Sequence, residues 1–435
     1  MPLFCGLFFG VSKRTEQIVI VGAGAAGLMC GIMTARSCKE AGINPRITIL
    51  DGARKIGAKI LVAGGGRCNV THHKVLPKDY AGGSRNAIKK VLKAFTEQET
   101  IAFFADLGVQ LKQEDTGKMF PVTDSAQTVL SALLNECDRL GVQIVQPWRV
   151  GSIEPDGTGY VIHPSDDRNT SISCDRLVLA TGGMALPKTG SDGAGYRFAK
   201  HLGHTVTDRV FPSLVPLVVD ASDTWVKDLS GISTRATLEV RSGTGKRQAS
   251  FTNELLCTHF GLSGPGVLDV SRWYLDAKQN DPDASLVINW LGDGRFDELD
   301  QQLQSLGKRT VSGWLRDRLP ERLAKAICQQ AGVDPTAPGH AISREQRRAL
   351  VKMLVECPVA IERDRGFTFA EVTAGGVPLS EIAPSTMQSR VADNLWIIGE
   401  LLDVDGRIGG FNFQWAWAGG TVAGRSIADS LTISV

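Results

Sequence analysis

The stretch QIVIVGAGAAG, residues 17–27, decides the fold of this chain. Its β-branched run Ile18–Val21 is typical of a buried parallel strand. The hexad Gly22–Gly27 then matches G-x-G-x-x-G and leads into a helical pattern, which is the setting that gives this motif its meaning. The first glycine makes the turn, the second admits a diphosphate, and the third lets helix and strand pack closely. The stretch therefore predicts a Rossmann-type βαβ unit.

A second strand is expected at Ile47–Leu50, and it ends at Asp51. A carboxylate at this point of the unit is typical of one that accepts a hydrogen bond from a ribose hydroxyl, and it disfavours a 2′-phosphate. The start of the preceding helix offers free N–H groups and partial positive charge to a diphosphate. The residues predict a dinucleotide site, and the alternative is a glycine-rich turn without a ligand.

The far end of the chain favours FAD over NAD. Leu395–Ile398 is a short apolar run that ends in Gly399-Glu400, and a helix is expected from about Asn412. A second helix start near the site suits the electron-rich N1/O2 edge of a reduced flavin. A plain NAD dehydrogenase does not need the chain to return at its far end. No second intact hexad follows a strand, so we expect a single dinucleotide domain.

Length and texture predict the domain organisation. A chain of 435 residues exceeds one ordinary core. We expect an α/β fold in which a discontinuous Rossmann domain, residues 1–210 and 365–435, is interrupted by an insertion at 211–364. The insertion is β-rich over about 211–295 and helical over about 296–358. Within its β-rich part, we expect Thr237–Ser271 to be β structure throughout.

Composition narrows the function classes. The chain is 43% hydrophobic and 22% charged, with a net charge of +2 and no basic stripe, so no nucleic-acid partner is expected. No run is long and apolar enough to cross a membrane. The nine cysteines form no C-x-x-C pair, which argues against disulfides and metal sites and favours the cytoplasm. The apolar segment Met1–Val11 is interpreted as an extension rather than a signal peptide. The oligomeric state is left open.

Three further motifs resemble those of one flavoprotein family. They are KILVAGGGRCNVTH (59–72), THFGLSGP (258–265), and GELLDVDG (399–406) with GGFNFQ (409–414). Their order and spread resemble the BaiN/YhiN-like flavoproteins across nearly the whole chain. The resemblance implies FAD bound in a two-part Rossmann domain, interrupted by a β-barrel-like piece and a helical piece. The family includes aminoacetone oxidase-like enzymes and bile-acid-type enone reductases.

The resemblance also implies that Lys59 and Gly64–Asn69 approach the flavin and its diphosphate. Consecutive glycines bring backbone close to a ring, and the two basic side chains add positive charge. Arg407-Ile408, Phe411 and Phe413 depart mildly from the family pattern, which bears on the substrate more than on FAD. The residues expected to contact the cofactor are Gly22, Gly24, Ala25, Ala26, Gly27, Asp51, Lys59, Gly64, Gly65, Gly66, Arg67, Cys68, Asn69, Val150, Thr181, Gly182, Gly399, Glu400, Asp403, Gly409, Gly410, Asn412, Phe413 and Gln414.

Two residues are candidates for a catalytic role. His259 is either a proton donor or substrate anchor over the flavin, or a histidine bonded to its own glycine turn. Arg67 orients an anionic substrate, stabilises charge at N1 or binds the diphosphate, and we prefer the cofactor role. Cys68 has no resolving cysteine at C-x-x-C spacing, so a packed thiol is favoured over a redox thiol.

Together these features predict an FAD-dependent oxidoreductase that transfers hydride between a small organic substrate and flavin N5. A reductase is favoured, and the other half-reaction uses NAD(P)H bound transiently without a domain of its own, another electron carrier, or oxygen. One alternative is an amine oxidase-type enzyme that produces peroxide. Another is a non-catalytic flavin sensor or RNA-associated flavoprotein.

Overall fold

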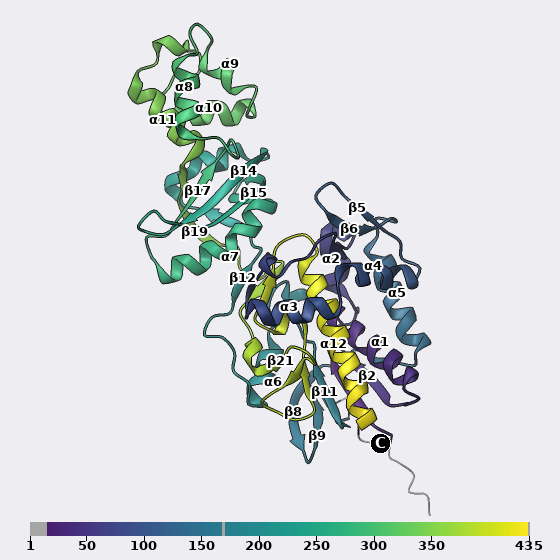
Figure 1. Cartoon of the computed structure of the whole chain (residues 1–435). Helices are drawn as coiled ribbons and strands as arrows, with labels where there is room; N and C mark the ends of the chain where they lie inside the picture. Colours follow the sequence, from purple (N-terminus) through teal and green to yellow (C-terminus); the bar gives the residue numbers. More distant parts are fainter. Residues whose placement is uncertain (1–14, 168–169, 434–435) are drawn as a thin grey trace, which may run out of the picture.

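The computed structural model describes residues 15–167 and 170–433 of the chain, so the Met1–Val11 extension lies outside the described residues. Figure 1 shows a larger body that holds both ends of the described chain, and an elongated arm built from its middle. The body carries the sheet that the glycine hexad predicts.

A seven-stranded sheet forms the centre of the body, in the order β21-β22-β23-β11-β1-β2-β7. The five strands from β23 to β7 pair in parallel, and Val21 aligns with both Leu50 and Leu179. The strands are β1 Gln17–Val21, β2 Arg46–Leu50, β7 Gln143–Val145, β11 Arg176–Leu179, β21 Ile382–Ala383, β22 Gln388–Ser389 and β23 Leu395–Ile397. The glycine turn therefore leaves the middle of a parallel sheet, between strands from both ends of the chain.

Two helices from opposite ends of the chain pack against each other beside this sheet (Figure 1). They are α1, Ala25–Glu40, and α12, Phe411–Ile433. Glycines allow the close approach: a Cβ on Gly420 would lie 2.6 Å from the carbonyl oxygen of Ala26, and one on Gly424 would lie 2.7 Å from the Thr34 nitrogen. The last helix thus begins one residue before the expected Asn412.

Smaller elements complete the body around this core. They are α2 Ala58–Gly66, β3 Thr71–His72, β4 Tyr80–Gly82, α3 Arg85–Ala94, α4 Glu97–Asp106, β5 Leu111–Gln113, β6 Lys118–Pro121, α5 Ala126–Arg139, β8 Val150–Asp156, β9 Gly159–Pro164, β10 Ile172–Cys174, α6 Ala194–His201, η6 Gly399–Leu401 and β24 Val404–Gly406. The α2 and α3 helices had no expected counterpart.

The arm consists of an antiparallel sheet, ordered β18-β17-β14-β15-β16-β13-β19, with helices at its far end. Its strands are β13 Leu217–Val219, β14 Ser233–Arg241, β15 Arg247–Thr258, β16 Gly261–Ser263, β17 Ser285–Asn289, β18 Cys357–Val359 and β19 Ile361–Asp364. Its helices are α7 Pro265–Asn280, α8 Phe296–Gln304, α9 Val311–Leu315, α10 Glu321–Gln330 and α11 Arg344–Val355. The strand pair β12 Phe211–Ser213 and β20 Val372–Ala374 joins arm to body.

One predicted segment of the arm is wrong. We expected Thr237–Ser271 to be β structure throughout, but its last residues form the start of α7. Gly264 turns the chain with a φ of +89°, and Pro265 occupies the first turn, where its missing N–H costs nothing. The proline therefore starts a helix rather than breaking a strand.

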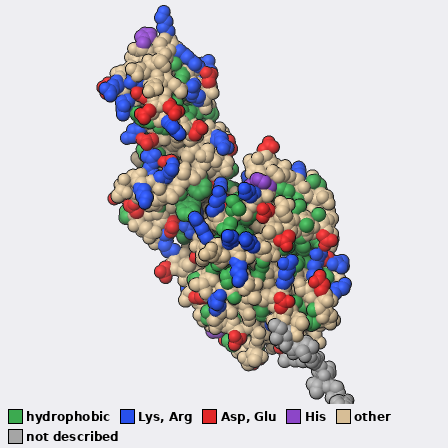
Figure 2. Space-filling model, in the orientation of Figure 1, with side chains coloured by type: hydrophobic (Ala, Val, Ile, Leu, Met, Phe, Trp, Pro, Cys, Tyr) green, Lys and Arg blue, Asp and Glu red, His purple; other side chains and the backbone are tan. Residues whose placement is uncertain are grey.

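Two separate hydrophobic clusters support the proposed domain division. One draws its members from residues 18–202 and 377–431, and the other from residues 217–359. The division into 1–210 with 365–435, and 211–364, stays a proposal. Figure 2 shows hydrophobic side chains together with lysine and arginine side chains where the arm joins the body.

Candidate active site

A cavity of about 710 Å³ lies at the carboxyl ends of β1, β2 and β11. Its wall includes Val21, Leu50 and Ala180, the residues at or just past these strand ends. In parallel sheets, ligands bind outside the carboxyl ends of the strands. The cavity extends from there toward the linkers that carry the arm, where Leu214 and Phe369 line it.

The glycine turn shapes the inner end of this cavity. Gly22, Gly24, Ala25 and Ala26 line it. Gly22 has a φ of +109°, and a Cβ there would lie 2.4 Å from the Ala180 oxygen. Gly24 begins α1 without a side-chain cap and would have nothing within 4 Å of a Cβ. The first N–H groups of α1 are therefore free to bind an anion.

The third glycine has a packing role. Gly27 does not line the cavity, and a Cβ there would lie 1.9 Å from the Gly22 oxygen. It permits contact between helix and strand, as the third glycine of the motif should.

Asp51 lies at the end of β2 and lines the same region. Its two carboxylate oxygens accept hydrogen bonds from the Ala23 and Ala53 nitrogens, both at 2.7 Å. These bonds fix the carboxylate, while each oxygen keeps a second lone pair for a hydroxyl group. Nearby, an ion pair between Arg149 and Asp192 crosses the cavity wall.

Lys59 and Glu400 form an ion pair in the wall, with 2.8 Å between Lys59 Nζ and Glu400 Oε2. Glu400 Oε1 also accepts from the Thr373 nitrogen at 3.0 Å. The pair joins α2 to η6, so elements from opposite ends of the sequence meet in one wall.

The glycine-rich loop expected at 63–69 overlaps the assigned end of α2, but the chain leaves helical geometry at Ala63, so its backbone from there is a loop. Gly64 and Gly65 have φ values of +58° and +69°, which glycine adopts without strain. Gly64, Gly65 and Asn69 line the cavity, whereas Gly66 does not. In the amide orientation that satisfies its hydrogen bonds, the side-chain oxygen of Asn69 accepts a hydrogen bond from the Gly410 nitrogen at 3.1 Å. This bond links the loop to the start of α12.

Arg67 and Cys68 differ in what they present to the cavity. Arg67 lines it, but its Nη1 is bound to Glu114 at 2.6 Å and its guanidinium lies 4.0 Å over the Phe120 ring. Cys68 is fully buried away from the cavity, and this burial raises the pKa of its thiol to about 12. Its packed role agrees with the preferred interpretation.

The segment around the start of α12 lines the cavity with Gly409, Gly410, Asn412, Phe413, Trp415 and Ala416. Asn412 closes the preceding turn: its Oδ1 accepts from the Gly406 nitrogen at 2.8 Å, and its Nδ2 donates to the Gly406 oxygen at 2.9 Å. The turn holds the helix start against the cavity.

Glu371 also faces the cavity, and no motif predicted it. Its side chain is exposed, but to the cavity interior, and the described residues offer it no hydrogen bond or ion pair. Desolvation by the surrounding protein and the nearby Asp269 raise the pKa of its carboxyl, against the opposing effect of Lys118 and Lys59.

The family described as HI0933-like protein Rossmann domain matches residues 16–426. The chain belongs to this family. Family membership and this cavity make it an FAD-dependent oxidoreductase.

Three relatives of this HI0933-like chain are similar along nearly their whole length. A ribosomal RNA dihydrouridine synthase from Haemophilus influenzae is 33% identical over 96% of the chain and 100% of the relative. A 3-dehydro-bile acid delta(4,6)-reductase from Clostridium scindens is 34% identical over 95% of the chain and 99% of the relative. A ribosomal RNA dihydrouridine synthase from Escherichia coli is 32% identical over 92% and 95%, respectively.

The cavity of the HI0933-like chain fits FAD on its own geometry. The uncapped α1 start and the open space at Gly24 suit a diphosphate, and the fixed Asp51 carboxylate suits a ribose. Val150, Thr181, Gly182 and Gly399 line the cavity as expected. Among residues 15–167 and 170–433, no group of His, Cys, Asp and Glu side chains could hold a metal ion, and no helix could span a membrane.

Five expected contacts do not line the cavity: Gly27, Gly66 and Cys68, described above, and Gln414 and Asp403, which support the wall from behind. Gln414 is fully buried, where its Oε1 accepts from Thr71 and its Nε2 donates to the Phe95 oxygen. Asp403 lies behind Gly82, and burial raises the pKa of its carboxyl. The motif located both near the site, but neither lines the cavity: Gln414 is buried in the first turn of α12, and Asp403 lies just before β24.

His259 lies outside the cavity, on the exposed turn between β15 and β16. The Thr258 hydroxyl closes this turn, with bonds of 3.0 and 3.2 Å to the backbone of Gly261. The neighbouring Phe260 is closer to the site, since Arg365 lies 4.2 Å over its ring and 3.6 Å over that of Phe369, which lines the cavity. The interpretation of His259 as a proton donor over the flavin is therefore wrong, because its side chain does not line the cavity.

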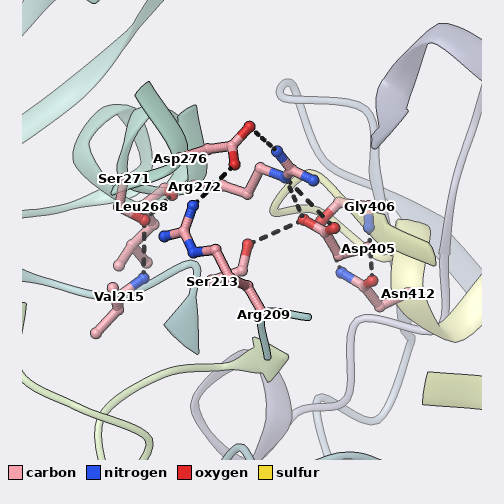
Figure 3. Close-up of polar contacts among 10 residues, drawn as sticks. All are labelled: Arg209, Ser213, Val215, Leu268, Ser271, Arg272, Asp276, Asp405, Gly406 and Asn412. Atoms are coloured by element: carbon pink, nitrogen blue, oxygen red, sulfur yellow. Dashed lines mark hydrogen bonds and ion pairs between the residues drawn. The ribbon is translucent and has the colours of Figure 1, made fainter. Parts of the chain in front are cut away.

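The joint between arm and body lies directly behind the start of α12 (Figure 3). Arg272 on α7 pairs with the buried Asp405 at 3.4 Å and with Asp276 at 3.1 Å. Ser213 donates to Asp405 at 3.1 Å, and Arg209 also contacts Asp276. Because Asp405 precedes the Gly406–Asn412 turn, the joint is continuous with the cavity wall.

Several lining residues were not predicted because they come from short strands, linkers and helix α6, none of which carries a motif. They are Lys118, Phe120, Trp148, Arg149, Asp192, Phe198, Leu214, Thr368, Phe369, Glu371 and Val372. A possible signal was a charged residue beside a β-branched strand, as in Glu371-Val372.

Proposed function

We propose that the protein reduces a carbon–carbon double bond conjugated to a carbonyl group. Dihydrouridine is uridine whose C5=C6 bond is saturated, and delta(4,6) names double bonds of a bile acid, so both relatives' names describe this chemistry. The observation that carries the proposal is the outer part of the cavity. There Leu214, Phe369 and Ile408 offer an apolar surface beyond the Lys59–Glu400 pair, which suits a flat, weakly polar substrate.

We propose a separate role for each group of residues in the cavity. Bound FAD supplies hydride chemistry at its N5 atom. With FAD bound, the α1 start would hold the diphosphate, Asp51 would accept from the ribose, and Lys59 would add positive charge to the site. The start of α12 would stabilise negative charge on the reduced flavin. Arg67 pairs with Glu114 and lines the cavity, and we propose that it contributes through the cofactor rather than through the substrate.

We infer that NAD(P)H is the reductant and binds transiently, because the sequence contains one glycine hexad. A cytoplasmic location stays a prediction that rests on the cysteine pattern. A small-molecule substrate also stays a prediction.

Anaerobic reduction followed by mixing tests the proposal. The photoreduced protein is mixed with 2-cyclohexenone or with air, and flavin absorbance and peroxide are followed. We expect the enone to restore the oxidised spectrum and NADPH to bleach it again. Rapid reoxidation by air with stoichiometric peroxide, and none by enone, would favour the oxidase alternative. If neither NADPH nor any alkene alters the flavin spectrum, the result contradicts the proposed reduction and favours the flavin-sensor alternative.

One observation favours RNA as a second candidate substrate. The α3 helix exposes Arg85, Lys89, Lys90 and Lys93, and no acidic side chain among the described residues forms an ion pair with them. Figure 2 shows basic side chains gathered over α3 on the face it presents. The absence of a basic stripe in the linear sequence therefore does not exclude RNA, because helical spacing gathers these residues on one side.

Binding of a transcribed ribosomal RNA fragment discriminates the two candidates. Substitution K89E/K93E should weaken binding about tenfold or more and flatten its salt dependence, if RNA contacts α3. The matched control K308E/K352E changes exposed lysines at the far end of the arm. Equal RNA binding by the wild type and both variants would contradict an RNA-binding role of α3 and favour a small-molecule substrate.

A further inference from the structure

We propose that Glu371 is the catalytic acid that protonates the substrate carbon. The inference rests on the proposed double-bond reduction, and it names a residue for the proton that this reaction requires. Hydride addition to one alkene carbon leaves negative charge on the carbon next to the carbonyl and on the carbonyl oxygen. A positioned acid in the same cavity completes the product.

The backbone around Glu371 is fixed. Its nitrogen donates to the Leu214 oxygen at 3.1 Å, and the next residues form β20, paired with β12. Leu214, Glu371 and Val372 all line the cavity. The carboxyl group is therefore presented by a paired segment at the outer, apolar part of the cavity, where the substrate is proposed to bind.

Glu371 differs from the other carboxylates of the cavity. Asp51 is held by two backbone N–H groups, Asp192 by Arg149, and Glu400 by Lys59 and the Thr373 nitrogen. Among the described residues, Glu371 is the lining carboxylate without such a partner. Its ionised form is therefore not stabilised by a paired cation or an N–H donor, so the carboxyl group keeps its proton more readily.

The surroundings keep this carboxyl protonated more than an ordinary glutamate. Desolvation is the largest cause of its raised pKa, and Asp269 on α7 adds to it. Lys118 on β6 and Lys59 on α2 act in the opposite direction. Arg407 also lines the cavity, but its guanidinium pairs with Asp269 and Asp79. A raised pKa brings a carboxylic acid closer to the pH at which it can donate efficiently.

One alkene carbon gains hydride from reduced FAD, the other gains the proton of Glu371, and the π bond breaks as two C–H bonds form. The substrate gains two electrons and the flavin loses two, which NAD(P)H replaces. The Glu371 carboxylate recovers its proton from water.

Two substrates that differ in their need for a proton test the assignment. A nitro group stores the negative charge on its own oxygens, so hydride transfer to 1-nitrocyclohexene does not require an acid, whereas reduction of 2-cyclohexenone does. In single turnovers, E371Q should reduce the enone about 100-fold or more slowly than the wild type. It should reduce the nitroalkene within about threefold of the wild type, and E371D should restore part of the enone rate. E362Q, an exposed glutamate on β19, is the control.

Ligand binding to the oxidised protein gives a readout without turnover. The affinity for benzoate, followed by the flavin spectrum, should fall in the wild type as pH rises and Glu371 ionises, because like charges repel. E371Q should lack this dependence while FAD affinity and the unfolding temperature stay unchanged.

Three outcomes would overturn the assignment. They are an unimpaired enone rate in E371Q, equal losses with both substrates at unchanged FAD affinity, and an unchanged pH dependence of benzoate binding. A wild-type protein that reduces neither alkene overturns the proposed function itself, and the acid role with it.

Discussion

Lys59 Nζ lies 2.8 Å from Glu400 Oε2, although 341 positions separate the two residues in the chain. Both side chains line the cavity, with 26% and 16% of their surfaces exposed. The contact closes a wall between α2 and η6. Because the pair is only partly exposed, removal of one partner leaves the other charge without its counterion.

The first prediction concerns this pair. K59M should weaken FAD binding about tenfold to 100-fold, because a positive charge beside the flavin is lost and Glu400 is left unbalanced. Quenching of FAD fluorescence measures the affinity. K325M removes a lysine whose ion pair with Glu321 is mostly exposed, and it should change nothing. Wild-type affinity in K59M would contradict the proposed contact.

Two neighbouring glycines should separate folding from cofactor binding. G22A forces a side chain into a backbone with φ of +109° and within 2.4 Å of the Ala180 oxygen, so it should lower the unfolding temperature by several degrees. G24A meets nothing within 4 Å and should leave the apoprotein stable, yet weaken FAD binding about tenfold, since the diphosphate needs that space. Unchanged FAD affinity in G24A would place the diphosphate elsewhere.

The joint of arm and body provides the third prediction. R272M leaves the buried Asp405 carboxylate without its cation, a change that typically costs about 3–5 kcal/mol. Urea unfolding should show this loss, and FAD affinity should fall with it, because Asp405 is continuous with the turn before α12. D405N should be milder, since Asn can still accept from Ser213. R309M, at an exposed pair with Asp317, is the control. Equal stability of R272M and R309M would contradict the role of the joint.

Buried thiols predict an alkaline limit of stability. Burial raises the pKa of Cys68 from 9.0 to about 12. Between these values the unfolded chain loses the thiol proton while the folded chain keeps it, so the free energy of unfolding falls as pH rises above about 9. C68A, which avoids a β-branched side chain at the left-handed backbone of Cys68 (φ +61°), should reduce this slope in urea titrations at about pH 9 to 11. Independently, native Cys68 should resist iodoacetamide at about pH 8.5 and react once the protein is unfolded. Rapid native alkylation would contradict its burial.

The sequence predicted best where a motif and its secondary structure agree. The hexad after Ile18–Val21 located the inner end of the cavity, because the turn, the helix start and Asp51 are determined by local geometry. The return of the chain near Gly399 was visible for the same reason. Motifs record which segment approaches a ligand, but not which alternate residues face it, so Gln414 and Asp403 were misassigned.

Tertiary pairing explains what the sequence did not reveal. Glu371 reaches the cavity because β12 pairs with β20, and Lys118 reaches it through the small β3-β6-β5 sheet. Neither pairing has a local signature. His259 was chosen from a motif whose physical role is a tight turn in the arm.

The packing of α1 against α12 has a consequence for synthesis on the ribosome. The first βα unit emerges early, yet its partner helix and the Glu400 side of the cavity follow some 370 residues later. The arm can fold around its own core before α12 is synthesised. During that time the face of α1 that packs against α12 stays exposed to solvent. A flavin signal from stalled ribosomes should therefore appear only once the last helix has left the exit tunnel.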